Sequence, residues 1–279
     1  MNSFAEKSFK VFAGSQFIKI AYREWGPENA SKVAICIHGL SRNMRDFDEF
    51  SNVISDSWRV LAVDMPGRGG SDWLDNKSSY NYELYEAVCA HAIAVSRAEK
   101  VVWIGTSMGG ILGMRLAAKG APFSKLVLND IGPFIPAEGR RHNQANFGKD
   151  PRFKTDEEGI AYIRDTRRTF GPFTEAGWKK FGRDSLRQLD DGNWTLHYDP
   201  GLASDAPISD TNMWELWPKI QVPVLTIWGE ESLLLTASTV DRMAYSGPKT
   251  EVFSVAGVGH CPGLTTPSEI SAIAEFIER

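Results

Sequence analysis

Cysteine is scarce in this 279-residue sequence: there are three, an odd number. No two of them are closely spaced, so neither a disulfide framework nor a zinc site is expected. We therefore expect Cys36, Cys89 and Cys261 to be free thiols and the chain to hold no metal ion. Free thiols are typical of a reducing compartment, which favours a cytoplasmic protein.

The sequence also lacks a surplus of positive charge and a long hydrophobic run. Lysine and arginine number 31 against 35 aspartates and glutamates, which gives a net charge of −4. This balance argues against nucleic acid or an anionic membrane as a partner. No run of about 18 apolar residues is present, so no segment is expected to span a bilayer. Residues 1–10 have no apolar stretch of the kind found in secretory signals, and we expect none there.

Short apolar runs do recur along the chain, and they predict buried strands. The expected strands are residues 9–12, 17–25, 33–37, 58–63, 101–104, 125–130, 222–229 and 250–255. Apolar residues at helical spacing predict helices at residues 47–54, 82–98, 111–117, 236–245 and 270–277. Strands that alternate with helices in this way are typical of an α/β fold with a mostly parallel sheet and helices on both faces.

The alternation breaks between residues 134 and 217, where no strong strand pattern is found. Helical patterns dominate there, at residues 157–170 and 174–189. The sequence therefore predicts a core domain made of residues 1–133 and 218–279. Residues 134–217 are expected to form a helical insertion that lies over the sheet as a lid.

Ser107 occupies the centre of Gly105-Thr106-Ser107-Met108-Gly109, between a predicted strand and a predicted helix. Gly-x-Ser-x-Gly in this context predicts a nucleophile elbow. So tight a turn strains the serine backbone, and side chains at 105 or 109 would collide with the neighbouring strand or helix. The free N–H groups of a helix N-terminus would favour negative charge developing beside Ser107. From these five residues alone, a glycine-rich turn with an N-cap serine is the alternative.

A serine hydroxyl needs a base to take its proton, and the base needs a third group to orient it. Of the five histidines, only His260 lies in a glycine-framed loop directly after the last predicted strand. The carboxyl ends of parallel strands share one edge of a sheet, so His260 is expected within reach of Ser107. His91 lies in a predicted helix and is expected in the core or on the surface. His142 and His197 lie in the insertion, where each would line a pocket or be exposed.

The oxyanion formed by serine attack needs backbone N–H donors. One is expected from Met108, which follows the nucleophile, and one from the loop after the strand that ends at Ile37. That loop begins His38-Gly39, so we expect Leu40 to supply the second N–H. His38 itself is expected to make structural hydrogen bonds and not to act as a second base.

These motifs together resemble the α/β-hydrolase superfamily, in its lid-bearing, esterase-like group. The matching segments are His38-Gly39, Asp64-x-Pro-Gly-x-Gly-x-Ser71, Gly105-Thr-Ser-Met-Gly-Gly110, Val222-Pro-Val-Leu225 and Gly257-x-Gly-His260. They occur in family order over nearly the whole chain. The resemblance implies an eight-stranded, mostly parallel sheet with a lid between the sixth and seventh strands, and no cofactor.

The sequence departs from the family pattern at the acid. The family usually has an aspartate shortly after the seventh strand, in a Gly-x-x-Asp pattern, whereas Ser232 stands here in Gly229-Glu230-Glu231-Ser232. Asp130 lies at the end of the sixth strand, a corner where some relatives place the acid. We therefore expect Asp130 to be the third member of a Ser-His-Asp triad, with Glu230 as the rival. A turn residue before Gly132-Pro133 is the alternative role for Asp130.

A serine nucleophile argues against the dehalogenase and epoxide-hydrolase branches, which the resemblance says use aspartate. The expected activity is hydrolysis of a small carboxylic ester, thioester or lactone, with C–C cleavage of a diketone as an alternative. A ligand-binding protein without activity is the second alternative, because fold does not fix function. The insertion contributes aromatic residues that would line a pocket for a small molecule with an apolar part. Of its arginines at 140, 141, 164, 167 and 168, most are expected on solvated faces, and one could anchor a substrate carboxylate.

Overall fold

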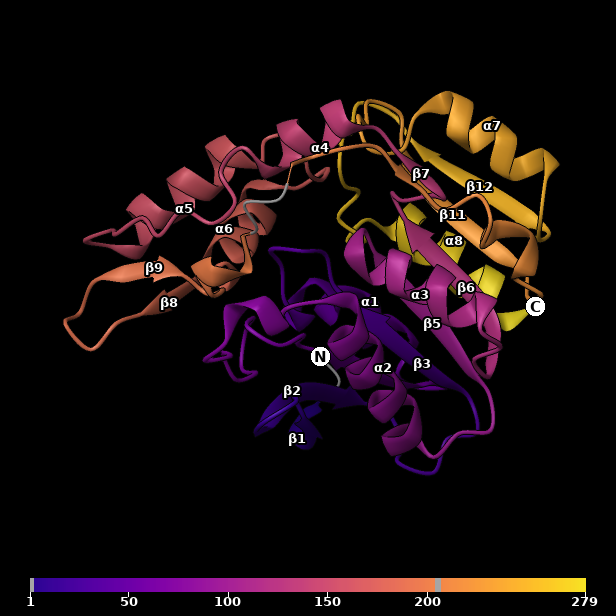
Figure 1. Cartoon of the computed structure of the whole chain (residues 1–279), viewed down its shortest axis with the longest axis horizontal. Helices are drawn as coiled ribbons and strands as arrows, with labels where there is room; N and C mark the ends of the chain where they lie inside the picture. The colour runs from indigo at the N-terminus through magenta and orange to yellow at the C-terminus, as the bar shows by residue number, and fades with distance from the viewer. Residues whose placement is uncertain (1–2, 204–206) are drawn as a thin grey trace.

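A computed structural model describes residues 3–203 and 207–279 and is organised around one eight-stranded sheet. Figure 1 shows the sheet running through the larger part of the molecule. The strand order is β1-β2-β4-β3-β5-β6-β11-β12. Their bounds are β1 (Phe4–Phe12), β2 (Phe17–Trp25), β3 (Val33–Ile37), β4 (Arg59–Val63), β5 (Val101–Thr106), β6 (Phe123–Asn129), β11 (Val224–Gly229) and β12 (Thr250–Val255).

The sheet is mostly parallel, as the sequence predicts. Strand β2 is antiparallel to both of its neighbours, β1 and β4, and a short turn joins it to β1. The strands β4, β3, β5, β6, β11 and β12 are all parallel to one another. The carboxyl ends of β5, β6, β11 and β12 therefore lie along one edge of the sheet. The predicted α/β-hydrolase fold is confirmed.

Helices cover both faces of this sheet. One hydrophobic core holds side chains from α2 (Tyr82–Ser96), α3 (Met108–Ala118) and α7 (Ala237–Tyr245). The other holds side chains from α1 (Asp48–Ile54) and α8 (Pro267–Glu278). The central strand β3 contributes Val33, Ile35 and Ile37 to the first core and Ala34 and Cys36 to the second. Alternate residues thus face opposite sides, which explains why this strand is apolar throughout.

The insertion contains more than helices. Its described residues, 134–203 and 207–217, hold α4 (Ala137–Gln144), α5 (Asp156–Thr166) and α6 (Glu175–Asp184), together with four short strands. Strand β7 (Phe134–Ile135) pairs with β10 (Thr211–Asn212), and β8 (Leu186–Gln188) pairs with β9 (Trp194–Leu196). None of these four strands belongs to the eight-stranded sheet. In Figure 1, α5, α6 and the β8–β9 hairpin lie together at the upper left, beside the sheet domain.

The sequence shows no strong strand pattern between residues 134 and 217, yet the structure has short strands there. Strands of two or three residues are too short to show an alternating pattern in the sequence. The helix expected over 174–189 ends at Asp184, because Leu186 pairs with Leu196 in the hairpin. The helix expected over 157–170 ends at Thr166. Phe153, Ile163, Leu186, Leu196 and Tyr198 form a small core of the insertion's own.

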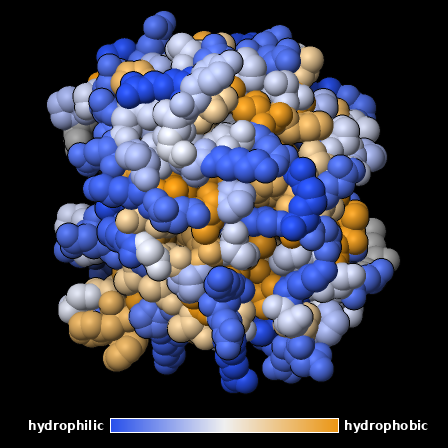
Figure 2. Space-filling view, turned by 90° about the vertical axis from the view of Figure 1, so that its right-hand side faces the viewer, coloured by the Kyte–Doolittle hydropathy of each residue, from blue (hydrophilic) through white to orange (hydrophobic). Residues whose placement is uncertain are grey.

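The remaining elements of the described part of the chain are four single turns of 3-10 helix. These are η1 (Met44–Phe47), η2 (Lys77–Ser79), η3 (Pro200–Leu202) and η4 (Trp217–Lys219). The three cysteines are all buried free thiols. Across the described residues, no helix is long and apolar enough to cross a membrane. On the face shown in Figure 2, hydrophilic side chains cover most of the surface and hydrophobic ones appear in small areas between them.

Candidate active site

Ser107 stands on a sharp turn between β5 and α3. Its backbone has φ of 50° and ψ of −110°, in a region that non-glycine residues rarely adopt. A Cβ atom at Gly105 would lie 2.3 Å from the backbone carbonyl carbon of Gly109, and one at Gly109 would lie 2.0 Å from the carbonyl oxygen of Ile37. Both positions therefore require glycine, for the steric reason expected from the sequence.

The side chains of Ser107, His260 and Asp130 form one chain of hydrogen bonds. The Nε2 atom of His260 lies 3.0 Å from the Ser107 hydroxyl oxygen, and its Nδ1 atom lies 2.7 Å from Oδ2 of Asp130. Asp130 follows β6, and His260 lies between β12 and α8. All three residues are buried, Asp130 completely. The structure thus brings together the three residues that the sequence singles out from separate parts of the chain.

Asp130 is held by more than His260. Its Oδ1 accepts the backbone N–H of Gly229 at 3.0 Å, and its Oδ2 accepts the hydroxyl of Ser232 at 2.6 Å. The Ser232 oxygen in turn accepts the N–H groups of Leu234 and Leu235. Ser232 therefore follows β11, the seventh strand of the sheet in chain order, and supports the carboxylate of Asp130, which follows β6. The rival carboxylate, Glu230, is exposed, and the Nδ1 of His260 bonds to Asp130.

The loop after β3 lies directly beside the elbow. A Cβ atom at Gly39 would be 3.5 Å from that of Ser107, so the next residue, Leu40, is close to the serine. Met108 is the first residue of α3, where a backbone N–H has no partner within the helix. Among the described residues, neither the Leu40 nor the Met108 N–H has a hydrogen-bond acceptor. Both groups are available to hold an oxyanion.

Arg68 contacts both Leu40 and Met108, a role that the sequence does not predict. Its side chain is completely buried, and its Nε donates to the carbonyl of Leu40 at 3.0 Å. Its other nitrogens donate to the Pro66 carbonyl and the Tyr85 hydroxyl, and one lies 3.6 Å from the Met108 sulfur. The one sequence feature that could have indicated this role is the position of Arg68 within the Pro66-Gly67-Arg68-Gly69 motif.

His38 makes structural hydrogen bonds, as predicted. Its Nε2 accepts the N–H of Met65 at 2.9 Å, so Nδ1 carries the proton and donates to the Gly39 carbonyl at 2.7 Å. Burial, together with the charge of Arg68, holds the pKa of His38 well below its usual value. His38 is therefore neutral and both of its nitrogens are occupied.

His197 is the one histidine of the insertion that is buried, while His142 is exposed. Its Nδ1 accepts the N–H of Gly69, and its Nε2 donates to the Ser41 carbonyl at 3.2 Å. Burial lowers the pKa of His197 to about 3. His197 therefore ties the insertion to two loops of the sheet domain and does not line the pocket beside Ser107.

A cavity of about 420 Å³ lies between the insertion and the sheet domain. Its apolar walls include Phe170, Phe173 and Phe181 from the insertion and Leu264 from the sheet domain. A narrower pocket contains Ser107 and His260, and Phe170 and Cys261 line both spaces. The ring of Phe170 lies edge-on to His260. A substrate's apolar part could therefore fill the larger cavity while its reacting group lies beside Ser107.

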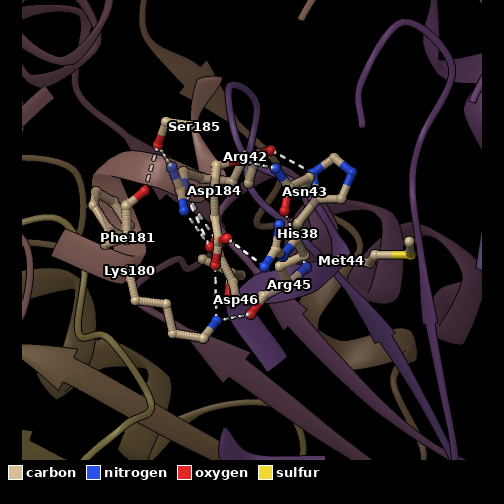
Figure 3. Close-up of polar contacts among 12 residues, drawn as sticks. His38, Arg42, Asn43, Met44, Arg45, Asp46, Lys180, Phe181, Asp184 and Ser185 are labelled. Atoms are coloured by element: carbon tan, nitrogen blue, oxygen red, sulfur yellow. Dashed lines mark hydrogen bonds and ion pairs between the residues drawn. The ribbon is translucent and has the colours of Figure 1, made fainter. Parts of the chain in front are cut away.

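A network of ion pairs fixes helix α6 to the segment after β3, as Figure 3 shows. Arg42 pairs with Asp46, bonds Ser185 and stacks over the ring of Phe181 at 3.6 Å. Lys180 lies 2.8 Å from Asp184 and 3.0 Å from Asp48. Burial opposes the charge of Lys180, but these two carboxylates outweigh it and raise the pKa of the lysine. The wall of the cavity is thereby held in place.

No group of three or more His, Cys, Asp or Glu side chains among the described residues is arranged to hold a metal ion. The residues around Ser107 instead supply a base, a carboxylate and two free N–H groups. This donor set fits acyl transfer at a serine.

Comparison with known proteins agrees with this geometry. A sequence model of the alpha/beta hydrolase family matches residues 34–273. The chain belongs to the α/β-hydrolase family. It is 36% identical to a 3-hydroxybutyrate-oligomer hydrolase of Cupriavidus necator, over 92% of each chain. It is 26% identical to an esterase of Escherichia coli, over 85% of this chain and 89% of that one.

Solved structures of this α/β-hydrolase family are also similar. An alpha/beta hydrolase from Novosphingobium aromaticivorans superposes with a TM-score of 0.89 and 28% identity, covering 100% of this chain and 99% of the other. The similarity to named hydrolases and esterases over the full fold shows that this α/β-hydrolase is an enzyme.

Proposed function

We propose that this α/β-hydrolase is a serine hydrolase that cleaves small carboxylic esters through an acyl-enzyme. The hydrogen-bonded chain from Ser107 through His260 to Asp130 carries the proposal. The alternative of a binding protein without activity was favoured only by the missing acid after the seventh strand. In the structure, Ser232 follows β11 and donates a hydrogen bond to Asp130, which is itself hydrogen-bonded to His260.

In the proposed reaction, the oxygen of Ser107 attacks the ester carbonyl carbon while His260 Nε2 takes the hydroxyl proton. Asp130 fixes the imidazole with its proton on Nδ1 and stabilises the imidazolium that forms. The N–H groups of Leu40 and Met108 hold the oxyanion. The tetrahedral intermediate then expels the alkoxide, which takes the proton from His260, and the acyl group stays on Ser107. Water, deprotonated by His260, attacks this acyl-enzyme and releases the acid.

We further propose short esters built from hydroxy acids as substrates. The relative from Cupriavidus necator, with its similarity over 92% of both chains, supports this substrate class. The cavity beside the serine, with its phenylalanine walls, has room for a short apolar chain. Thioesters and lactones react through the same steps and are further candidate substrates. The buried free thiols fit a reducing compartment such as the cytoplasm.

Residues 134–217 are proposed to act as a lid over residues 1–133 and 218–279. The insertion has its own small core, and it contributes Phe147 and Phe170 to the pocket that contains Ser107. A lid in this place excludes water and selects substrates. No partner beyond the small-molecule substrate is proposed.

Active-site labelling tests this proposal. A fluorophosphonate probe should attach to Ser107, and Ser107→Ala should lose labelling together with at least about 10³-fold of turnover on 4-nitrophenyl butyrate, because triad residues act as a unit. Ser15→Ala, in the exposed turn between β1 and β2, is the matched control and should keep both. Full esterase activity in Ser107→Ala would overturn the proposal.

A further inference from the structure

Arg167 extends from the end of α5 into the pocket that contains Ser107 and His260. One of its terminal nitrogens donates to the Ser41 hydroxyl at 3.2 Å and the other to the carbonyl of Thr166 at 3.3 Å. Ser41 directly follows Leu40, whose backbone N–H has no acceptor among the described residues. The guanidinium of Arg167 therefore lies beside the proposed oxyanion site, although it comes from the insertion.

The charge of Arg167 has no carboxylate partner among the described residues. Its neighbours differ: Arg42 pairs with Asp46, and Arg164 pairs with Glu175. Arg68 has no carboxylate either, but its donors are engaged by two carbonyls, a hydroxyl and a sulfur. Arg167 has five N–H donors, of which two make hydrogen bonds to residues that the structure describes.

The side chain of Arg167 is half-buried, and its guanidinium lies 5.9 Å from the centre of the Phe170 ring. Removal from water lowers the pKa of Arg167, and the nearby charge of Arg42 acts in the same direction. A charge that has lost part of its hydration is stabilised when an anion pairs with it. An arginine left unpaired in a pocket beside a nucleophile is a site for a planar, two-oxygen anion.

We infer that Arg167 binds a carboxylate of the substrate, so that the preferred esters carry a free acid group near the scissile bond. This inference rests on the proposed ester hydrolysis and makes it narrower. A linear hydroxy-acid oligomer ends in such a carboxylate, on the alcohol side of its last ester. A half-ester of a dicarboxylic acid has its carboxylate on the acyl side. The same guanidinium could bind either, and the test distinguishes them.

The test compares each anionic substrate with its neutral counterpart. The first pair is the linear dimer of 3-hydroxybutyrate and its methyl ester, and the second is mono-4-nitrophenyl succinate and its methyl ester. For wild type, Arg167→Gln, Arg167→Lys and the exposed neighbour Arg168→Gln, the ratio of kcat/KM between anionic and neutral substrate is measured. Thermal unfolding of each variant is measured alongside.

In Arg167→Gln, this ratio should fall by about 10- to 100-fold in at least one pair, the effect of losing a charged hydrogen bond. Arg167→Lys should recover part of it, since charge is kept but the planar fork is lost. Arg168→Gln should keep the wild-type ratio.

A purely structural role of Arg167, such as holding Ser41, would lower the rates with anionic and neutral substrates together. An unchanged ratio in both pairs would therefore overturn the inference, even if all rates fell. If the wild-type enzyme hydrolysed none of the four esters, the proposed ester hydrolysis itself would be wrong, which is a separate result.

Discussion

The hydroxyl of Ser232 donates a hydrogen bond of 2.6 Å to Oδ2 of Asp130, the same oxygen that accepts from His260. Ser232, which follows β11, and His260 thus both donate to Oδ2 of Asp130, which follows β6. The departure of Ser232 from the family pattern and the position of Asp130 are two parts of a single arrangement. A carboxylate at 232 would instead face Asp130 directly, and two close carboxylates repel each other.

Removing the Ser232 hydroxyl should weaken catalysis without abolishing it. Ser232→Ala deprives the Asp130 carboxylate of one donor, and hydrogen bonds to charged groups contribute about 1.5–3 kcal/mol, so we expect kcat/KM to fall about tenfold or more. Ester turnover checks this, with the exposed Ser238→Ala as control. Full activity in Ser232→Ala would show that the hydroxyl does not support Asp130.

Asp130 and Glu230 can be separated by exchanging each for its amide. Asp130→Asn should cost on the order of 10⁴-fold in kcat, because the amide favours the wrong tautomer of His260. Glu230→Gln should be nearly unaffected, because Glu230 is exposed and the Nδ1 of His260 bonds to Asp130. Steady-state kinetics under identical conditions decide between them. The reverse outcome would place the acid after the seventh strand.

Arg68 is expected to act as a positioning residue for the oxyanion site. Arg68→Lys cannot keep all four of the contacts made to Leu40, Pro66, Tyr85 and Met108. Misplacing an oxyanion donor should lower kcat by about 10- to 100-fold while KM changes little. Kinetics and thermal unfolding are measured together. A variant that unfolds more easily but keeps its kcat would contradict this role.

The stability of the fold should decrease in acid because of His197. Its folded-state pKa of about 3 lies below the value of about 6.5 expected in the unfolded chain. The unfolded state therefore binds an extra proton between these values, so the stability is present above the higher value and is lost as pH falls. His38, whose pKa is also lowered, acts in the same direction.

Urea unfolding between about pH 6 and pH 4 measures this effect. His197→Gln should reduce the pH slope of the unfolding free energy by about 1.4 kcal/mol per pH unit. The exposed His142→Gln is the control. An unchanged slope in His197→Gln would mean that His197 is protonated in the folded protein.

The chain order and the spacing of apolar residues predict much of this molecule. Buried strands such as β3 are apolar throughout, and the serine elbow requires small residues for steric reasons that a sequence displays directly. His260 and Asp130 each follow a strand, and their proximity follows from the rule that the carboxyl ends of parallel strands share one edge of the sheet. Their roles in catalysis stay predictions until the variants are measured.

Contacts between distant segments could not be predicted in the same way. Arg68 and His197 act through hydrogen bonds that cross from one loop to another, and no local pattern marks them. Arg167 looks like the exposed arginines beside it until the fold shows where its guanidinium lies. The two short strand pairs of the insertion were missed because pairing over two or three residues leaves no periodicity.

Trapping the covalent intermediate tests the central claim most directly. The protein is mixed with 4-nitrophenyl butyrate, quenched in acid within its first turnovers, and analysed by intact mass and peptide mapping. A serine hydrolase of the proposed kind should carry one butyryl group, located on Ser107, with release of 4-nitrophenol. Hydrolysis that proceeds with no acyl group on Ser107, or with the acyl group on another residue, would contradict the account.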